Sequence, residues 1–334
     1  MVLELIAIAL VGTGVIWIGT RWLEPAANTI ARAYRLPSIV QGAILIAAAS
    51  SFPELASVVL ASLRHQQFEL GVAAIIGSAI FNVLVIPAVV VFFGDDPVDA
   101  SRELVYKDAQ FYLLAIVVTF LTFTLAVVYV PLETGGTAGE MTRWLVMLPL
   151  ALYGIYIGVH YLDIIEGDDP LPDAYARASK AFVGFIGGIV AILIGVEALL
   201  HAAIEFGELF DTPSYLWGLT IVAIGTSLPD MMLSIRAVQA QRPVVSLSNV
   251  FGSNIFDLLV AIPAGVLVAG TVTVQLERSV PMFGFLVMAT VVAMAAMRTA
   301  LALSRREAYL LMLLYMLFAG WVLLESVGLV NLIG

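Results

Sequence analysis

The feature that most limits how this chain can fold is a series of ten apolar runs, each about as long as a membrane core is thick. They cover residues 2–23, 38–63, 69–93, 108–130, 143–162, 178–204, 214–238, 244–269, 280–297 and 307–328. Backbone polar groups find no water inside a membrane, so a spanning run must form a helix. Composition agrees, because 61% of the residues are hydrophobic and only 12% are charged. We therefore expect an all-α polytopic membrane protein with ten transmembrane helices.

The distribution of Lys and Arg predicts the orientation of the chain. If all ten runs span, loops on the side of the N-terminus hold three basic residues, and loops on the other side hold the remaining twelve. Loops rich in Lys and Arg stay in the cytoplasm. We therefore expect a multi-pass protein of the cell membrane, with both termini extracellular and the acidic linker 163–177 cytoplasmic. The chain has no cysteine, which excludes disulfide bonds and thiolate sites.

Two polar motifs interrupt the apolar runs, and each motif occurs twice. The first reads SSFPE, ending at Glu54, and returns as TSLPD, ending at Asp230. The second reads GSAIFN, ending at Asn82, and returns as GSNIFD, ending at Asp257. Glu54 and Asp230 are 176 residues apart, and Asn82 and Asp257 are 175 apart. A nearly constant offset over two motifs indicates an internal duplication.

The duplication divides the chain into two halves. Residues 1–162 contain the first five predicted helices, and residues 178–334 contain the other five, with 163–177 between them. Because five is odd, the second half enters the membrane from the opposite side. Inverted repeats of this kind place the substrate site near the bilayer midplane, on interrupted helices. We expect the duplicated motifs to form that site together.

Three carboxylates lie within the duplicated motifs, at Glu54, Asp230 and Asp257. A charged side chain at mid-membrane costs roughly 2.5–3.5 kcal/mol on the insertion scale. No Lys or Arg lies at mid-membrane in these runs to offset that cost. A bound cation is therefore the natural partner of these acids.

The residue types around the acids also fit a cation. Pro53 and Pro229 each precede an acid and remove a helical hydrogen bond, which leaves a carbonyl oxygen free. Calcium binds six to eight oxygens, carboxylates among them, and sodium also accepts carbonyls and hydroxyls. In the first motif, hydroxyl groups precede each acid by about one helical turn. In the second motif, a serine precedes the last residue of the motif by four positions, so the two side chains lie on one helix face. These hydroxyls belong to Ser50, Ser51, Thr226, Ser227, Ser78 and Ser253.

Other interpretations of the same residues remain open at this point. Gly, Ser and Pro in membrane helices also act as packing and kinking devices, and buried acids can be protonated and purely structural. A cation channel would show conductance that is not coupled to a second ion. An intramembrane aspartyl protease would also use two acids, and cleavage of a membrane peptide would identify it.

The motifs resemble the alpha repeats of the cation/calcium exchanger superfamily, whose halves carry G-T-S-x-P-E/D and G-S-N/A-x-F-N/D. The resemblance is best over 38–93 and 214–269, and the second motif looks most like that of the potassium-dependent sodium/calcium exchangers. It implies a transporter and not an enzyme: a sodium/calcium antiporter that works by alternating access and needs no cofactor. A proton/calcium or magnesium exchanger of the same fold is the nearest alternative.

The resemblance also implies roles for individual residues. Glu54 and Asp230 match the calcium-ligating acids, and Asn82 and Asp257 match a central pair in which Asp is associated with potassium dependence. Ser50 stands where the family usually has threonine, so this ligand departs from the pattern. The carbonyls of Ala47 and Ala223 match calcium ligands of the family. The family positions that line the sodium sites are occupied here by Ser51, Ser78, Thr226, Ser227 and Ser253.

Charge counting raises the question of which ion accompanies calcium. Three ionised acids carry a charge of −3, whereas one calcium ion supplies +2, and an unpaired buried charge is costly. We hypothesise that Asp257 either binds potassium beside calcium or is protonated when calcium is bound. The partners expected from the sequence are calcium, sodium and the lipid bilayer, with potassium or protons as alternatives and no nucleic acid.

Overall fold

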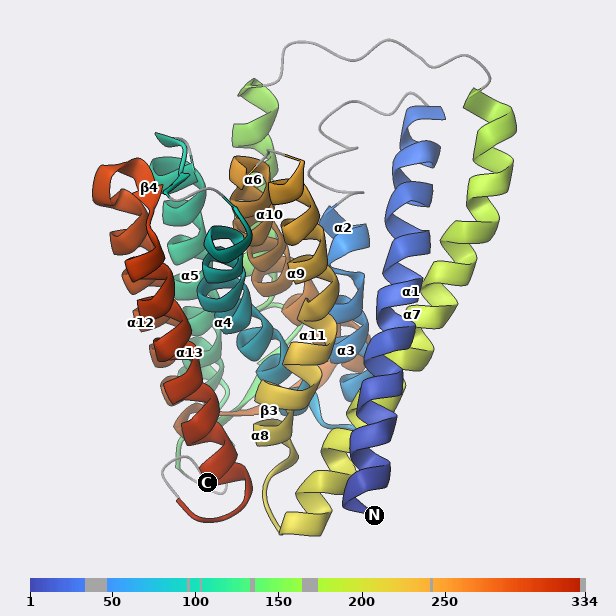
Figure 1. Ribbon diagram of the computed structural model, residues 1–334. Coiled ribbons are helices and arrows are strands. Elements are labelled where there is room, and N and C mark those ends of the chain that lie inside the picture. Colours follow the sequence, from blue (N-terminus) through green and yellow to red (C-terminus); the bar gives the residue numbers. More distant parts are fainter. Residues whose placement is uncertain are drawn as a thin grey trace.

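The computed structural model describes residues 1–33, 47–94, 97–102, 104–132, 136–163, 174–240 and 243–330. Most of them are helical (Figure 1). The α-helices are α1 (Val2–Ala33), α2 (Ala47–Ser50), α3 (Phe52–Leu63), α4 (Phe68–Phe93), α5 (Ala109–Tyr129), α6 (Met147–Asp163), α7 (Ala174–Phe210), α8 (Ser214–Trp217), α9 (Ala223–Gln239), α10 (Pro243–Phe256), α11 (Ile262–Ala269), α12 (Leu276–Arg298) and α13 (Arg305–Ser326). Shorter turns are the π-helical η2 (Leu104–Asp108), η3 (Gly218–Val222) and η4 (Asp257–Ala261), and the 3-10 helix η5 (Thr299–Leu301).

Eight helical segments of the described chain are long and apolar enough to cross a membrane. They coincide with eight of the ten predicted runs. The other two runs, 38–63 and 143–162, correspond to the shorter apolar helices Phe52–Leu63 and Met147–Val159. The part of the first run at 38–46 lies outside the described residues. The all-α polytopic class is confirmed, and the count of ten crossings stays a prediction.

The first helix is longer than the sequence indicated. The predicted break after residue 23 is wrong, because α1 continues through Pro25 to Ala33. Proline is tolerated inside membrane helices, where neighbouring groups can satisfy the freed carbonyl. The start of α1 and the end of α13 lie at the same end of the bundle (Figure 1).

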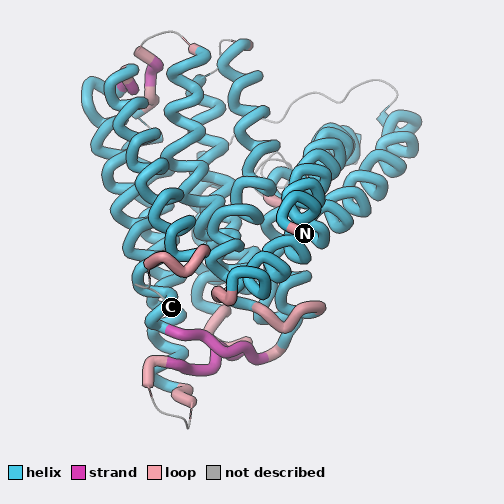
Figure 2. Tube along the Cα trace, turned by 60° about the horizontal axis from the view of Figure 1, so that its bottom comes forward, coloured by secondary structure: helices cyan, strands magenta, loops and turns pink. Residues whose placement is uncertain are grey.

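Two short antiparallel ribbons join loops of the two halves. Strand β1 (Val98–Asp99) pairs with β4 (Ala302–Leu303), and β2 (Ala138–Thr142) pairs with β3 (Thr271–Gln275). Figure 2 shows these ribbons at opposite ends of the helical bundle. Each ribbon takes one strand from residues 1–162 and one from 178–334, so the halves are tied together at both ends.

Helix α4 is the most buried spanning helix, with 94% of its spanning window inside the bundle. It is apolar all round, as a helix enclosed by protein on every side should be. Its counterpart in the second half is the continuous segment Ser246–Ala269, which is 78% buried. The second polar motif of each half therefore lies at the centre of the protein.

Helices α1 and α7 pack along each other at one side of the bundle (Figures 1 and 2), where α7 also contacts α3 and α1 also contacts α9. A Cβ atom added to Gly12 would lie 2.9 Å from the carbonyl oxygen of Gly195, and one added to Gly188 would lie 2.8 Å from that of Gly19. Positions 12 and 188 are 176 residues apart, as are 19 and 195. The two helices are thus antiparallel and meet at equivalent glycines, which an inverted repeat requires.

Candidate cation site

The segment that carries the first polar motif departs from regular α-helix in each half, but at different places. In the first half the chain leaves the helix at Ser51, between α2 and α3, and the proline N–H missing at Pro53 accounts for a break here. In the second half α9 passes through Pro229 without a break. Its irregular turn is η3, which ends at Val222, before the motif.

The three predicted acids are brought together in the interior. Glu54 on α3 is 1% exposed, Asp230 on α9 is 3% exposed, and Asp257 at the start of η4 is fully buried. Glu54 and Asp230 are close enough to repel each other, and Asp257 is repelled by both. Like charges gathered in a low-dielectric interior need compensation by a cation or by protons.

Each of the two motif acids accepts a hydrogen bond from a serine of its own half. The Ser78 hydroxyl donates to Glu54 Oε1 at 3.3 Å, and the Ser253 hydroxyl donates to Asp230 Oδ2 at 3.3 Å. Ser78 and Ser253 are equivalent positions of the repeat, as are Glu54 and Asp230. The internal symmetry therefore extends to side-chain contacts.

A second symmetric pair of hydrogen bonds crosses between the halves. The Ser227 hydroxyl donates to Ser78 Oγ at 2.7 Å, and Ser51 Oγ lies 2.7 Å from Ser253 Oγ. Because Ser253 already donates its proton to an acid, Ser51 is the donor in the second contact. Glu54 and Asp230 therefore each accept a hydrogen bond from a serine of their own half. That serine is in turn hydrogen-bonded to a serine of the other half.

The remaining hydroxyls and carbonyls of the predicted ligand set bond to one another. Ser50 Oγ donates to the Ala47 carbonyl at 3.0 Å, and Thr226 Oγ1 donates to the Ala223 carbonyl at 3.3 Å. The Ala47 carbonyl also accepts the N–H of Ser51 at 3.0 Å. The roles of these groups as ion ligands stay predictions.

Two asparagines form a chain of hydrogen bonds that links Asp230 to the first half. Asn82 Nδ2 lies 3.4 Å from Asp230 Oδ2 and donates to Asn254 Oδ1 at 3.0 Å. Asn254 Nδ2 in turn donates to the carbonyl of Ala79 at 3.3 Å. The sequence reasoning did not single out Asn254. The sequence does show that the equivalent position of the first half is Ala79, so the second half has an additional amide side chain here.

Within the described parts of the chain, five buried acceptor oxygens in this region have no hydrogen-bond partner. They are Glu54 Oε2, Asp230 Oδ1, Asn82 Oδ1 and both carboxylate oxygens of Asp257. An unsatisfied buried acceptor costs about 1–3 kcal/mol, and more when it is charged. Five such oxygens together are hard ligands of the kind that calcium and sodium prefer.

The acids do not form a metal site by themselves. Within the described part of the chain, no group of three or more His, Cys, Asp and Glu side chains is arranged to hold a metal ion. The amide of Asn82, the serine hydroxyls or backbone carbonyls would have to complete the coordination of a cation.

Comparison with known proteins agrees with this geometry. The family model for "Sodium/calcium exchanger protein" matches residues 4–162 and 180–324. CaxA of Alkalimonas amylolytica, a candidate antiporter, is 27% identical over 264 residues, which is 76% of this chain and 77% of CaxA. Sodium/potassium/calcium exchanger 2 of Rattus norvegicus is 36% identical over 95 residues, which is 28% of this chain and 14% of that protein.

Two kinds of solved exchanger share the fold. The sodium-calcium exchanger NCX_Mj is 22% identical with a TM-score of 0.63, covering 96% of this chain and 99% of that one. The H+/Ca2+ exchanger CAX is 16% identical with a TM-score of 0.71, covering 97% and 86%. The family match spans both halves and all four polar motifs. The chain therefore belongs to the sodium/calcium exchanger family within the cation/calcium exchanger superfamily.

Proposed function

We propose that this protein is a secondary active antiporter that exchanges calcium for sodium by alternating access. The five unpaired acceptor oxygens, contributed by both halves in one buried region, carry the proposal. Exchange requires only that the two ions compete for the same oxygens, so no covalent chemistry and no cofactor are needed. Calcium flux in proteoliposomes under an imposed sodium gradient tests the proposal.

The two ions compete at one site, but the groups that line their positions differ in part. Glu54 and Asp230, related by the repeat, bind calcium with the carbonyls of Ala47 and Ala223. Asn82 and Asp257 form the central pair. The sodium positions are lined by Ser50, Ser51, Ser78, Thr226, Ser227 and Ser253. The hydrogen bonds between serines of the two halves support this set of ligands, because an ion bound to either acid would interact with hydroxyl groups linked to both halves.

The proposed movement is that of α1 and α7 across a static site. The two helices pack closely on each other at four glycines, which supports their moving as one unit (Figure 1). The repeats 1–162 and 178–334 would then exchange roles between the outward-open and inward-open states. Part of the linker that joins them, 164–173, lies outside the described residues.

The proposed orientation can be tested with single cysteines, because the natural chain has none. Both termini and the end of α7 would be extracellular, and the end of α9 cytoplasmic. In intact cells, a membrane-impermeant maleimide should label Glu208→Cys, which is exposed near the end of α7. The same reagent should label Ala240→Cys, which is exposed just after α9, only in permeabilised cells. The reverse pattern would overturn the orientation.

Asp257 is the proposed determinant of the accompanying ion. If it binds potassium, sodium-driven calcium uptake should rise with potassium at fixed pH, and Asp257→Asn should remove that dependence. The substitution makes the two halves alike, since the equivalent residue is already Asn82. The absence of a potassium effect in the natural protein, or its survival in Asp257→Asn, would exclude the potassium version.

Proton-coupled calcium exchange is the second candidate function. Both oxygens of Asp257 lack a hydrogen-bond partner, so this carboxyl group could carry a proton in place of a cation. Calcium uptake would then follow a pH gradient and be independent of sodium. Magnesium is the corresponding alternative substrate, and competition between magnesium and calcium for uptake measures it.

A further inference from the structure

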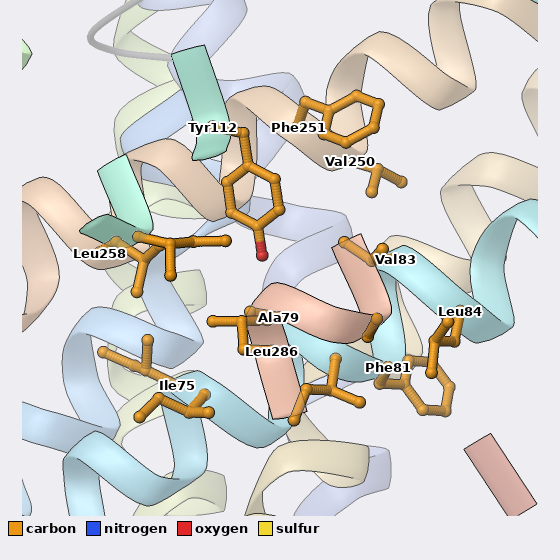
Figure 3. Close-up of a cluster of buried hydrophobic side chains, with 14 of the residues drawn as sticks. Ile75, Ala79, Phe81, Val83, Leu84, Tyr112, Val250, Phe251, Leu258 and Leu286 are labelled. Atoms are coloured by element: carbon orange, nitrogen blue, oxygen red, sulfur yellow. The ribbon is translucent and has the colours of Figure 1, made fainter. Parts of the chain in front are cut away.

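A buried tyrosine outside the proposed ligand set faces the site. Tyr112 lies on α5 and is fully buried, and its ring packs against Phe251 with 5.7 Å between ring centroids. Figure 3 shows its hydroxyl end pointing away from Phe251, toward Ala79 and Leu258. These two residues belong to α4 and η4, the elements that carry Asn82 and Asp257. The polar end of Tyr112 is thus directed at the centre of the site.

Among the described residues, none makes a hydrogen bond of standard geometry with the Tyr112 hydroxyl. The side chains of Thr290 and Asn254 are nevertheless within hydrogen-bonding reach of it, and Asp257 is within electrostatic range. Thr290 has already committed its own proton to the carbonyl of Leu286, at 2.8 Å. A phenylalanine would fill the same space without burying an unpaired hydroxyl, which is unfavourable. Packing alone therefore does not explain a tyrosine here.

The same face of α5 also supports the backbone of η4. Thr119, seven residues after Tyr112 and hence on the same side of the helix, donates its hydroxyl to the carbonyl of Leu258 at 3.3 Å. Leu258 directly follows Asp257 in the π-helical turn. Helix α5 therefore lies against the Asp257 end of the site at two positions about two helical turns apart, Tyr112 and Thr119.

Asn254 is the group through which the hydroxyl can act. Its amide accepts from Asn82 and donates to Ala79, which leaves one N–H and one oxygen lone pair. Either of these can pair with a tyrosine hydroxyl. Asn254 also lies three residues before Asp257, so both side chains project from the same side of the helix. A change in the position of Asn254 would reach the acids at this end of the site.

We propose that Tyr112 is a positioning residue that restrains Asn254 and thereby sets the sodium affinity of the adjoining position, which is lined by Ser253. The inference rests on the antiporter function proposed above. It assigns a role in ion selectivity to a residue of α5, outside the duplicated motifs.

The test compares Tyr112→Phe with Tyr215→Phe in purified, reconstituted protein. Tyr215 is a matched control, because it is 2% exposed and its hydroxyl also lacks a hydrogen-bond partner. Its charged neighbours are Glu69, Arg278 and Glu325, which lie outside the proposed site. Calcium uptake is measured over a range of sodium and of calcium concentrations, and thermal unfolding in detergent is followed with and without sodium.

We expect Tyr112→Phe to raise the half-saturating sodium concentration about three- to tenfold, the effect that one hydrogen bond between Tyr112 and Asn254 would have on binding. The half-saturating calcium concentration should change less than about twofold, with maximal rate and unfolding midpoint unchanged. Stabilisation of the variant by sodium should require correspondingly more sodium, a readout that does not depend on transport. Tyr215→Phe should match the natural protein in every measurement.

An unchanged sodium dependence in Tyr112→Phe would overturn the inference, as would an equal change in Tyr215→Phe. In either case sodium-driven uptake by the natural protein would still stand. If the natural protein shows no sodium-driven uptake, the proposed antiporter function fails first. The two failures are therefore distinguishable.

Discussion

Replacing Glu54 by glutamine is expected to abolish sodium-driven calcium exchange. The amide keeps the size of the side chain and can still accept the hydrogen bond from Ser78. It removes the negative charge and places an N–H donor where a cation needs an oxygen. Loss of a direct ligand should lower uptake by about 100-fold or more, since even supporting residues of metal sites account for 10–100-fold. The measurement is calcium uptake into proteoliposomes at saturating sodium.

Folding should survive this substitution. An uncompensated buried charge destabilises a fold, so replacing it by a neutral amide should not lower the unfolding midpoint. Asp230→Asn, at the equivalent position of the other half, should behave in the same way. Glu4→Gln is the control, because that side chain is 80% exposed and lies far from the motifs in sequence. Near-normal uptake by Glu54→Gln in folded protein would refute the assignment of this residue.

Gly77→Ala is expected to destabilise the protein and to disrupt transport. A Cβ atom at this position would lie 2.4 Å from the carbonyl oxygen of Leu219 and 2.7 Å from the Cβ of Ala223. Both neighbours are fixed by the backbone of η3 and α9, so helix α4 would have to move. Forcing atoms into a packed interior costs about 1–3 kcal/mol. Thermal unfolding in detergent, followed by flux measurement, gives both effects.

The repeat supplies a matched control for that substitution. Gly252 is the equivalent glycine of the second half, and the nearest atom to an added Cβ there is the hydroxyl of Tyr156, at 4.0 Å. Gly252→Ala should therefore leave stability and transport close to those of the natural protein. Equal unfolding midpoints for the two alanine variants would contradict the close approach of α4 to η3.

The helical framework followed from the sequence because the membrane leaves few choices. A run such as 69–93 has to be a helix, and the structure places α4 there. Helix ends were less predictable, because helices continue beyond the apolar run: α1 passes Pro25, and α7 reaches Phe210, six residues beyond the predicted end. The extension of α1 is held by packing, because Ala26, Ala27 and Ala31 are buried there, and the hydropathy of the sequence does not show such packing.

The composition of the candidate site was predictable within each half. Helical spacing placed Ser78 on one face with Asn82, and the structure shows Ser78 bonded to Glu54. The contacts between halves were not predictable. The pairing of Ser51 with Ser253 depends on how two distant segments pack, and a single sequence does not contain that information. The duplication showed only that any such contact should occur twice.

Residues that act from outside the motifs were missed. Tyr112 looks in the sequence like an aromatic residue of an ordinary apolar helix, and its burial beside Asn254 appears only in three dimensions. The unequal geometry of the first motif was also unexpected. Similar residues around Pro53 and Pro229 give a break in one half and a continuous helix in the other. Tertiary packing, and not local sequence, decides between these outcomes.

The most direct test of the central claim is calcium flux into proteoliposomes that contain the natural protein, under sodium, potassium and proton gradients imposed one at a time. The proposed function predicts that an outward sodium gradient drives calcium uptake against its own gradient, and that no uptake occurs without a counter-ion. Uptake driven by a proton gradient alone, or calcium movement uncoupled from any second ion, would contradict sodium/calcium exchange.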